Sequence, residues 1–256
     1  ALKASSPQAG IGDFFFDDFH HNGAYLLSYW RATALFGYDK TGPTTESWYD
    51  LPDLGTQDQY QFFLDVGPLS NLDEYYGEDN IFWQQLKEHP NYDEFWQSRG
   101  IIRHLDDIKP AVMVVGGLFD AEDLYGPFNT YKKIEETSDN HNIMVFGPWS
   151  HGDWARQTER QAVGNVYFGD NISEDYQRNV ETTFFNHFLK KGGEGDLDLA
   201  EAYVYDTGAR KWNSYEAWPP KEAEPKVFYL GDEQELTDEA TDNEESFVSD
   251  PAKPVS

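Results

Sequence analysis

The sequence contains no cysteine, no long apolar run and few basic residues. The absence of cysteine excludes disulfide bonds, thiolate metal sites and a cysteine nucleophile. No stretch reaches the roughly 18 consecutive apolar residues of a transmembrane helix. The first residues, Ala1-Leu2-Lys3, form neither a start methionine nor a signal peptide. We therefore expect the natural N-terminus, with any targeting signal, to lie outside this chain.

The chain is strongly acidic, with 47 acidic and 19 basic residues among 256 and a formal net charge of −28. Nucleic acids and anionic membranes bind basic surfaces, so neither is expected as a partner. Aromatic residues make up 16% of the chain, which is too many for a disordered acidic segment. The length allows one full domain, or one domain with part of a second.

Two short apolar runs each end in glycine-containing backbone and lead to a residue of a catalytic type. Residues 112–119 precede Asp120, and residues 143–150 precede His151. Both runs predict buried parallel strands. An α/β-hydrolase sheet presents the last two members of a Ser, Asp, His triad in this chain order. The alternative interpretation makes Asp120 a helix N-cap and His151 an ordinary loop residue.

The first member of such a triad is missing, because no Gly-x-Ser-x-Gly occurs in the sequence. A serine nucleophile needs a neutral imidazole to accept its proton, and the imidazole needs a carboxylate to fix its tautomer. Asp120 and His151 could supply these two groups. The sequence therefore predicts a fragment that begins downstream of its own nucleophile and is inactive by itself.

The organisation along the chain predicts a partial α/β-hydrolase domain with an inserted helical cap. We expect strands at 111–116 and 143–147, a helix at about 124–136, and a second helix with Ser173 as its N-cap and Gly192 near its end. After about 197, β-type segments predict the beginning of a truncated β jelly-roll domain. The expected parts are the hydrolase core at 1–21 and 109–196, the cap at 22–108 and the jelly roll at 197–256.

The motifs around the two candidate catalytic residues resemble those of the α-amino-acid ester hydrolases. The matching segments are 117–127, which contains Asp120, and 146–152, which contains His151. Residues 17–24 are similar to the stretch that follows the nucleophile in that family. Glutaryl-7-aminocephalosporanic acid acylases, cocaine esterase and X-Pro dipeptidyl-peptidases are wider relatives.

The resemblance implies an upstream Gly-x-Ser-Tyr-x-Gly elbow, roughly 15 to 20 residues before Ala1, and a C-terminal jelly roll. It implies a serine hydrolase that acts without a cofactor through an acyl-enzyme on α-amino-acid esters or β-lactam amides. It also implies a periplasmic or secreted location. Such a protein has a small-molecule ester or amide as its partner and could form a homo-oligomer.

The resemblance further implies that three carboxylates bind the α-ammonium group of the substrate. The matching positions are Asp18, Glu122 and Asp123. Clustered acids favour a cation through charge-assisted hydrogen bonds, and their repulsion raises at least one carboxyl pKa. The alternative interpretation is a solvated acidic loop in a protein that is acidic everywhere.

Other interpretations remain open at the level of sequence. His20 and His21 stand beside Asp17 and Asp18 and would suit zinc, but no third ligand follows at a telling spacing, so no metal is expected. A glutaryl or cephalosporin acylase, or an X-Pro dipeptidyl-peptidase-like hydrolase, is the enzyme alternative, although three acids would repel a glutaryl carboxylate. A carbohydrate-binding β-module that uses Trp212 and Trp218 is the non-enzyme alternative. Trp149 and Trp154, which flank His151, are expected to pack in a pocket wall.

Overall fold

The computed structural model describes residues 2–37, 42–43, 45, 51–156, 159–191, 197–231, 235–242, 244 and 246–253. The chain divides into two compact units. The first unit comprises Ala1–Thr33 and Gln84–Pro220, and the second comprises Ala34–Trp83 and Lys221–Ser256. All candidate site residues belong to the first unit.

A five-stranded sheet forms the centre of the first unit, in the order β1-β4-β5-β8-β9. The first four strands are parallel and the last is antiparallel. Every residue of β4 and β5 is buried, as expected for parallel strands covered on both faces. The two predicted strands are thus confirmed. The strand bounds are β1 Ala4–Ser5, β4 Ala111–Gly117, β5 Asn142–Gly147, β8 Ala202–Asp206 and β9 Lys211–Tyr215.

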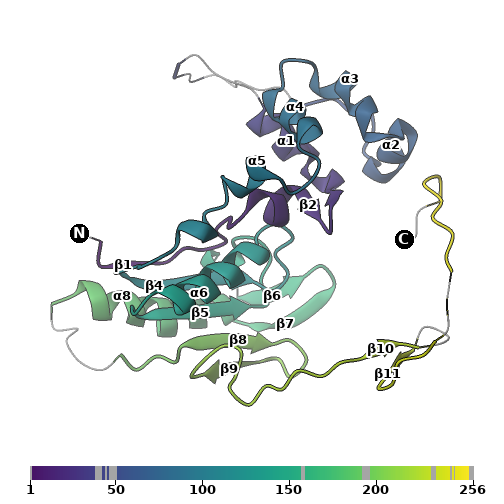
Figure 1. Cartoon of the computed structure of the whole chain (residues 1–256). Coiled ribbons are helices and arrows are strands. Elements are labelled where there is room, and N and C mark those ends of the chain that lie inside the picture. The colour runs from purple at the N-terminus through teal and green to yellow at the C-terminus, as the bar shows by residue number, and fades with distance from the viewer. Residues whose placement is uncertain are drawn as a thin grey trace. The chain divides into compact units, whose positions relative to one another are not determined.

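Helices cover both faces of this sheet (Figure 1). On one face, helix α6 (Tyr125–Thr137) packs Tyr131 and Ile134 against alternate residues of β4 and β5. On the other face, Tyr176 and Phe184 pack against the remaining side chains of the two strands. They belong to a continuous helical segment made of α7 Ile172–Tyr176, the π-helical turn η6 Gln177–Glu181 and α8 Thr182–Leu189.

The predicted N-cap of this second helical segment is wrong. The helix begins at Ile172, after Asn171 in the left-handed conformation with φ of 58°. Ser173 is fully buried, and its hydroxyl accepts a hydrogen bond from Trp149 Nε1 at 2.9 Å and donates to the carbonyl of Asp153 at 3.0 Å. The serine therefore satisfies tertiary partners and not the helix end. The expected stop at Gly192 lies outside the described residues.

The sheet continues past the boundary expected at 197. Strand β8 pairs in parallel with β5, and Met144 lies opposite Ala202. Trp212 on β9 is partly buried and packs against the core of this sheet, with its ring centroid 5.5 Å from that of Trp149. The assignment of β8 and β9 to a separate jelly roll was wrong, because local strand propensity does not reveal which sheet a strand joins. Further along, the described residues form a short antiparallel pair, β10 Tyr229–Leu230 and β11 Leu236–Thr237.

The described residues of the segment expected as a helical cap include several short helices, but the segment does not form one unit. Residues 34–83 belong to the second unit, whereas 22–33 and 84–108 belong to the first. Asp17 and Asp18 lie in a π-helical turn. The elements of residues 15–104 are η1 Phe15–Phe19, β2 His20–His21, β3 Ala24–Tyr25, η2 Leu27–Tyr29, α1 Trp30–Phe36, α2 Gln59–Val66, η3 Leu69–Leu72, α3 Asp73–Tyr76, α4 Ile81–Glu88, α5 Glu94–Gln97 and η4 Ile102–His104.

Three short elements follow β5 before the second helical segment. They are the 3-10 turn η5 Asp153–Ala155 and the hairpin strands β6 Arg160–Val163 and β7 Val166–Asp170. None of the helices that the structure describes has the length and apolarity needed to cross a bilayer.

Candidate active site

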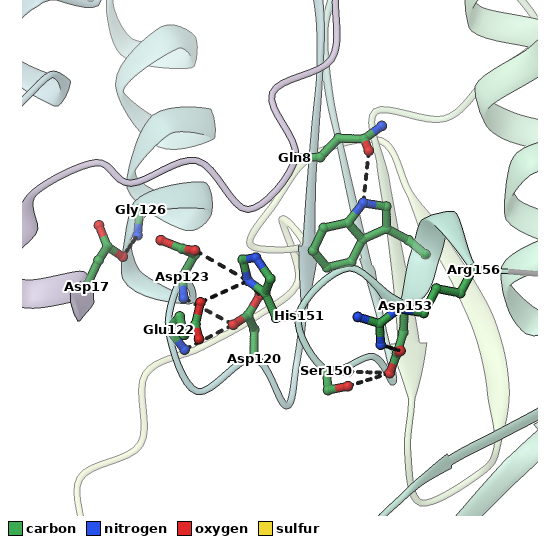
Figure 2. Close-up of polar contacts among 11 residues, drawn as sticks. Gln8, Asp17, Asp120, Glu122, Asp123, Gly126, Ser150, His151, Asp153 and Arg156 are labelled. Atoms are coloured by element: carbon green, nitrogen blue, oxygen red, sulfur yellow. Dashed lines mark hydrogen bonds and ion pairs between the residues drawn. The ribbon is translucent and has the colours of Figure 1, made fainter. Parts of the chain in front are cut away.

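The ends of β4 and β5 bring Asp120 and His151 into contact. These strands are parallel neighbours, with Gly117 opposite Gly147, so the loops that follow them leave the same edge of the sheet. His151 Nδ1 lies 3.0 Å from Asp120 Oδ2 (Figure 2). An added Cβ at Gly117 would lie 2.3 Å from the carbonyl oxygen of Trp149, so glycine is needed for this close approach of the two loops.

The surroundings of Asp120 fix its carboxylate. The side chain is fully buried, and Oδ1 accepts hydrogen bonds from the backbone N–H groups of Glu122 at 3.0 Å and Asp123 at 3.2 Å. With Oδ2 on His151, both oxygens have partners. The His151 side chain is half exposed, and its second ring nitrogen carries none of the contacts drawn in Figure 2. This arrangement can orient a neutral imidazole while leaving Nε2 free to exchange a proton.

Two more carboxylates approach the same histidine. Glu122 Oε2 and Asp123 Oδ2 each lie 3.5 Å from His151 Nδ1. Asp18 lies near enough for its charge to act on Asp123 and for Glu122 and His151 to act on Asp18. The structure therefore gathers Asp18, Glu122 and Asp123 into one acidic cluster beside the Asp120–His151 pair.

Burial and mutual repulsion raise two carboxyl pKa values in the acidic cluster. The pKa of Asp123 rises to about 8, first through burial and then through the charges of Asp18 and Asp17. Burial also raises the pKa of Asp18 to about 6, against an opposing effect of the Tyr29 hydroxyl. That hydroxyl is buried and faces the Asp18 carboxylate, whose charged form it favours. Sequence reasoning did not find Tyr29, because one more tyrosine in an aromatic-rich segment carries no distinguishing signal.

One oxygen of the acidic cluster lacks a partner. Asp123 Oδ1 is buried and accepts no hydrogen bond within the described part of the chain. Leaving a buried acceptor unpaired costs about 1–3 kcal/mol, and more for a charged group. The atom is therefore suited to a donor that arrives with a ligand.

An aromatic cavity of about 510 Å³ adjoins Asp120 and Glu122. This volume is in the range of pockets for small molecules. His20 in its wall is buried and stacks on Phe15 with ring centroids 4.2 Å apart, and burial lowers its pKa to about 4, so it is neutral near pH 7. The cavity is lined by Phe16, His20, His21, Asn22, Asp120, Glu122, Leu124, Tyr125, Phe128 and Asn129.

The structure does not support the zinc site that the neighbouring histidines and acids of residues 17–21 had suggested. Within the described ranges, the one group whose possible ligand atoms converge is Asp120, Asp123 and His151, within 4.8 Å of one another. His20 and His21 are not part of it. Since His151 Nδ1 already contacts Asp120, a metal there would displace the contact that orients the imidazole.

The loop that carries His151 has its own supports. Ser150 donates from both its backbone N–H and its hydroxyl to Asp153 Oδ2 (Figure 2). Gly152 adopts the left-handed conformation with φ of 80°. Trp154 is buried, and its Nε1 donates to Gln8 Oε1 at 2.8 Å. Trp149 and Trp154 are thus core residues behind the loop. Among the hydrogen bonds of the described residues, none joins a serine hydroxyl to His151.

Comparison with known proteins identifies the family of the chain. Residues 1–153 match the family model described as X-Pro dipeptidyl-peptidase (S15 family). The chain belongs to this family. Cocaine esterase from Rhodococcus sp. (strain MB1 Bresler) is 24% identical over 186 residues, which cover 67% of this chain and 31% of the esterase.

Two solved structures resemble the whole chain. An aminopeptidase from a marine sediment Thaumarchaeota archaeon matches with a TM-score of 0.82 and 32% identity, and an α-amino acid ester hydrolase matches with a TM-score of 0.80 and 27% identity. Each match covers 100% of this chain and 42% of the other chain. The chain therefore has the fold of part of these hydrolases and spans less than half the length of the relatives it matches.

Proposed function

We propose that this chain supplies the acid–base pair and the amine-binding pocket of a serine hydrolase that acts on esters or amides of α-amino acids. The supporting observation is the convergence on His151 Nδ1 of a buried aspartate at 3.0 Å and two further carboxylates at 3.5 Å. The nucleophilic serine is expected from a part of the protein outside these 256 residues, because no nucleophile elbow occurs within them.

The acid–base step assigns one role to each member of the pair. Asp120 accepts the Nδ1–H of His151 and holds the tautomer in which Nε2 is unprotonated. Nε2 takes the serine proton as the serine oxygen bonds to the substrate carbonyl carbon. The same proton then passes to the leaving alcohol or amine as the acyl-enzyme forms, and water repeats the sequence to release the acid.

The acidic cluster provides the basis for substrate choice. Asp18, Glu122 and Asp123 would form charge-assisted hydrogen bonds with a substrate ammonium group, and Asp123 Oδ1 has no other partner among the residues that the structure describes. The same charges would repel a glutaryl carboxylate, which disfavours the glutaryl acylase alternative. A free α-ammonium occurs both in amino-acid esters and at the N-terminus of a peptide, so peptide amides are the second substrate candidate. The resemblance to an aminopeptidase favours including it.

The experiment uses a longer protein that contains this chain and has the length of its relatives, here called the family-length protein. We expect its kcat/KM to be at least about tenfold higher for an α-amino-acid ester than for the same ester without the amino group, since a hydrogen bond to a charged group is worth about 1.5–3 kcal/mol. A dipeptidyl anilide measures the peptidase alternative in parallel. Equal kcat/KM values for the two esters would contradict the amine pocket, and a preference for a glutaryl amide would replace it with the acylase function.

A fluorophosphonate probe tests the serine mechanism separately. We expect it to label one serine of the family-length protein and none in the 256-residue chain. Stoichiometric labelling of the short chain would show that its own serines suffice and would contradict an external nucleophile.

A further inference from the structure

Asp17, the neighbour of Asp18, joins two distant segments of the chain through its buried carboxylate. Its Oδ2 accepts hydrogen bonds from the backbone N–H groups of Gly12 at 2.8 Å and Asp13 at 3.0 Å. Its Oδ1 accepts the N–H of Gly126, in the first turn of α6, at 2.5 Å (Figure 2). The side chain is fully buried, so these three N–H groups replace water as its partners.

The two segments meet backbone to backbone at this point. A Cβ at Gly126 would lie 2.2 Å from the carbonyl oxygen of Gly10 and 2.5 Å from the nitrogen of Gly12. Glycine is therefore required for steric reasons on the α6 side of the junction. Asp17 also joins the two segments, because its carboxylate accepts hydrogen bonds from backbone N–H groups of both.

We propose that Asp17 is a positioning residue that holds Asp18 against Glu122 and Asp123 and so determines the shape of the amine pocket without touching the substrate. Asp17 precedes Asp18 directly, and its partner Gly126 lies only three residues after Asp123, at the start of α6. Fixing the distance between Asp17 and Gly126 therefore limits the distance between the two halves of the acidic cluster. This inference rests on the proposed function.

The role needs a carboxylate, because both oxygens act as acceptors. In Asp17→Asn, one oxygen becomes an NH2 group that would face a backbone N–H, so the contact to α6 or the contacts to Gly12 and Asp13 would be lost. The contact between Asp120 and His151 depends on the ends of β4 and β5 and should remain. The change should therefore impair amine binding more than the acid–base pair.

Asp13 provides a matched control in the same segment. It is also a buried aspartate, but it accepts hydrogen bonds from the Phe15 N–H at 2.9 Å and the Tyr92 hydroxyl at 2.6 Å, and none from α6. Asp13→Asn therefore perturbs a buried carboxylate of the same segment and leaves the Asp17 hydrogen bond to Gly126 in place. A merely structural role for Asp17 would make the two variants behave alike.

The test measures binding by the purified 256-residue chain, since the amine pocket needs no nucleophile. Calorimetry compares an α-amino-acid amide with the same amide lacking the amino group. We expect the parent to prefer the amine, Asp17→Asn to lose roughly tenfold or more of that preference, and Asp13→Asn to change it by less than about threefold. Amide hydrogen exchange should show faster exchange at Gly126 in Asp17→Asn, and slower exchange at Gly126 when the parent binds the amine.

Further outcomes separate this inference from the proposed function. A parent that does not prefer the amine would overturn the amine pocket and this inference together. A parent that prefers it, with the preference retained in Asp17→Asn or lost equally in Asp13→Asn, would overturn only the role of Asp17. If Asp17→Asn fails to fold, Gly126→Ala opens the same junction from the α6 side, and the exchange of Gly126 in the ligand-bound parent still decides.

Discussion

The Asp120–His151 pair and the acidic cluster lie side by side, yet they differ in how their carboxylates are satisfied. Both oxygens of Asp120 have protein partners, two backbone N–H groups and the imidazole. Asp123 is also buried, but its Oδ1 has no partner among the described residues. The hydrogen bonds of the Asp120 carboxylate are thus all made within the protein. The acidic cluster keeps a carboxylate oxygen without a donor, as expected of a site that receives a cation.

The difference extends to charge. Burial raises the pKa of Asp123 to about 8, so this group is largely protonated near pH 7 until a cation arrives. An ammonium ligand would offset the repulsion among Asp18, Glu122 and Asp123 and favour the ionised form. Binding of the amine should therefore release a proton from the acidic cluster, while the Asp120–His151 pair keeps its arrangement.

The largest expected effect comes from substitutions in the Asp120–His151 pair. In the family-length protein, His151→Ala and Asp120→Asn should each lower kcat on the order of 10³–10⁴-fold, because the base or its tautomer is lost. The loss should be the same for substrates with and without the amino group, since neither residue is assigned to the amine. Steady-state kinetics measures the effect, and circular dichroism checks the fold. Near-parental rates in His151→Ala would remove it from the role of base.

A smaller and selective effect should follow from changing the acidic cluster. Glu122→Gln or Asp123→Asn should raise KM for amino-acid esters by roughly ten- to a hundredfold, the value of a hydrogen bond to a charged group. The KM of esters without the amino group should change little. Glu136→Gln is a control, because Glu136 is an exposed acid on α6 whose carboxylate lies 3.9 Å from Lys132 Nζ. Equal KM changes for both kinds of ester would show that the acidic cluster shapes the cavity but does not bind the amine.

The sequence predicted the elements that depend on local pattern. The continuous apolar runs of β4 and β5 identified buried strands, and parallel neighbours necessarily bring Asp120 and His151 to one edge. It failed where the partner is distant. Ser173 matches a helix cap locally but contacts Trp149, and β8 has the same strand character whichever sheet it joins.

The members of the acidic cluster could be predicted from the sequence only through the resemblance to a family. The hydrogen bonds of Asp17 that support the cluster were not predicted. Asp17 was noted for a metal, while its actual partners are backbone N–H groups of Gly12, Asp13 and Gly126. Backbone donors have no signature in side-chain identity. The available signal was the set of glycines at 10, 12 and 126, which permits two segments to approach closely, but it cannot be paired across the chain without the fold.

A further expected effect is a pH dependence of stability that distinguishes the two regions without any substrate. The folded pKa of Asp123 is raised from 3.8 to about 8, so between these values the folded chain binds a proton that the unfolded chain releases. Stability from this group is complete below about pH 4 and is lost as the pH rises through about 8, with a slope of at most about 1.4 kcal/mol per pH unit.

Asp18, with a folded pKa of about 6, should add a similar slope over a narrower window. Urea unfolding of the 256-residue chain between pH 4 and pH 8 measures the sum. Asp123→Asn should flatten the profile because it removes the titrating group, whereas Glu136→Gln on the surface of α6 should not. A parental stability that stays constant, or that rises with pH over this window, would show that burial and repulsion do not raise these carboxyl pKa values in the free protein. The acidic cluster would then not differ in this respect from the Asp120–His151 pair.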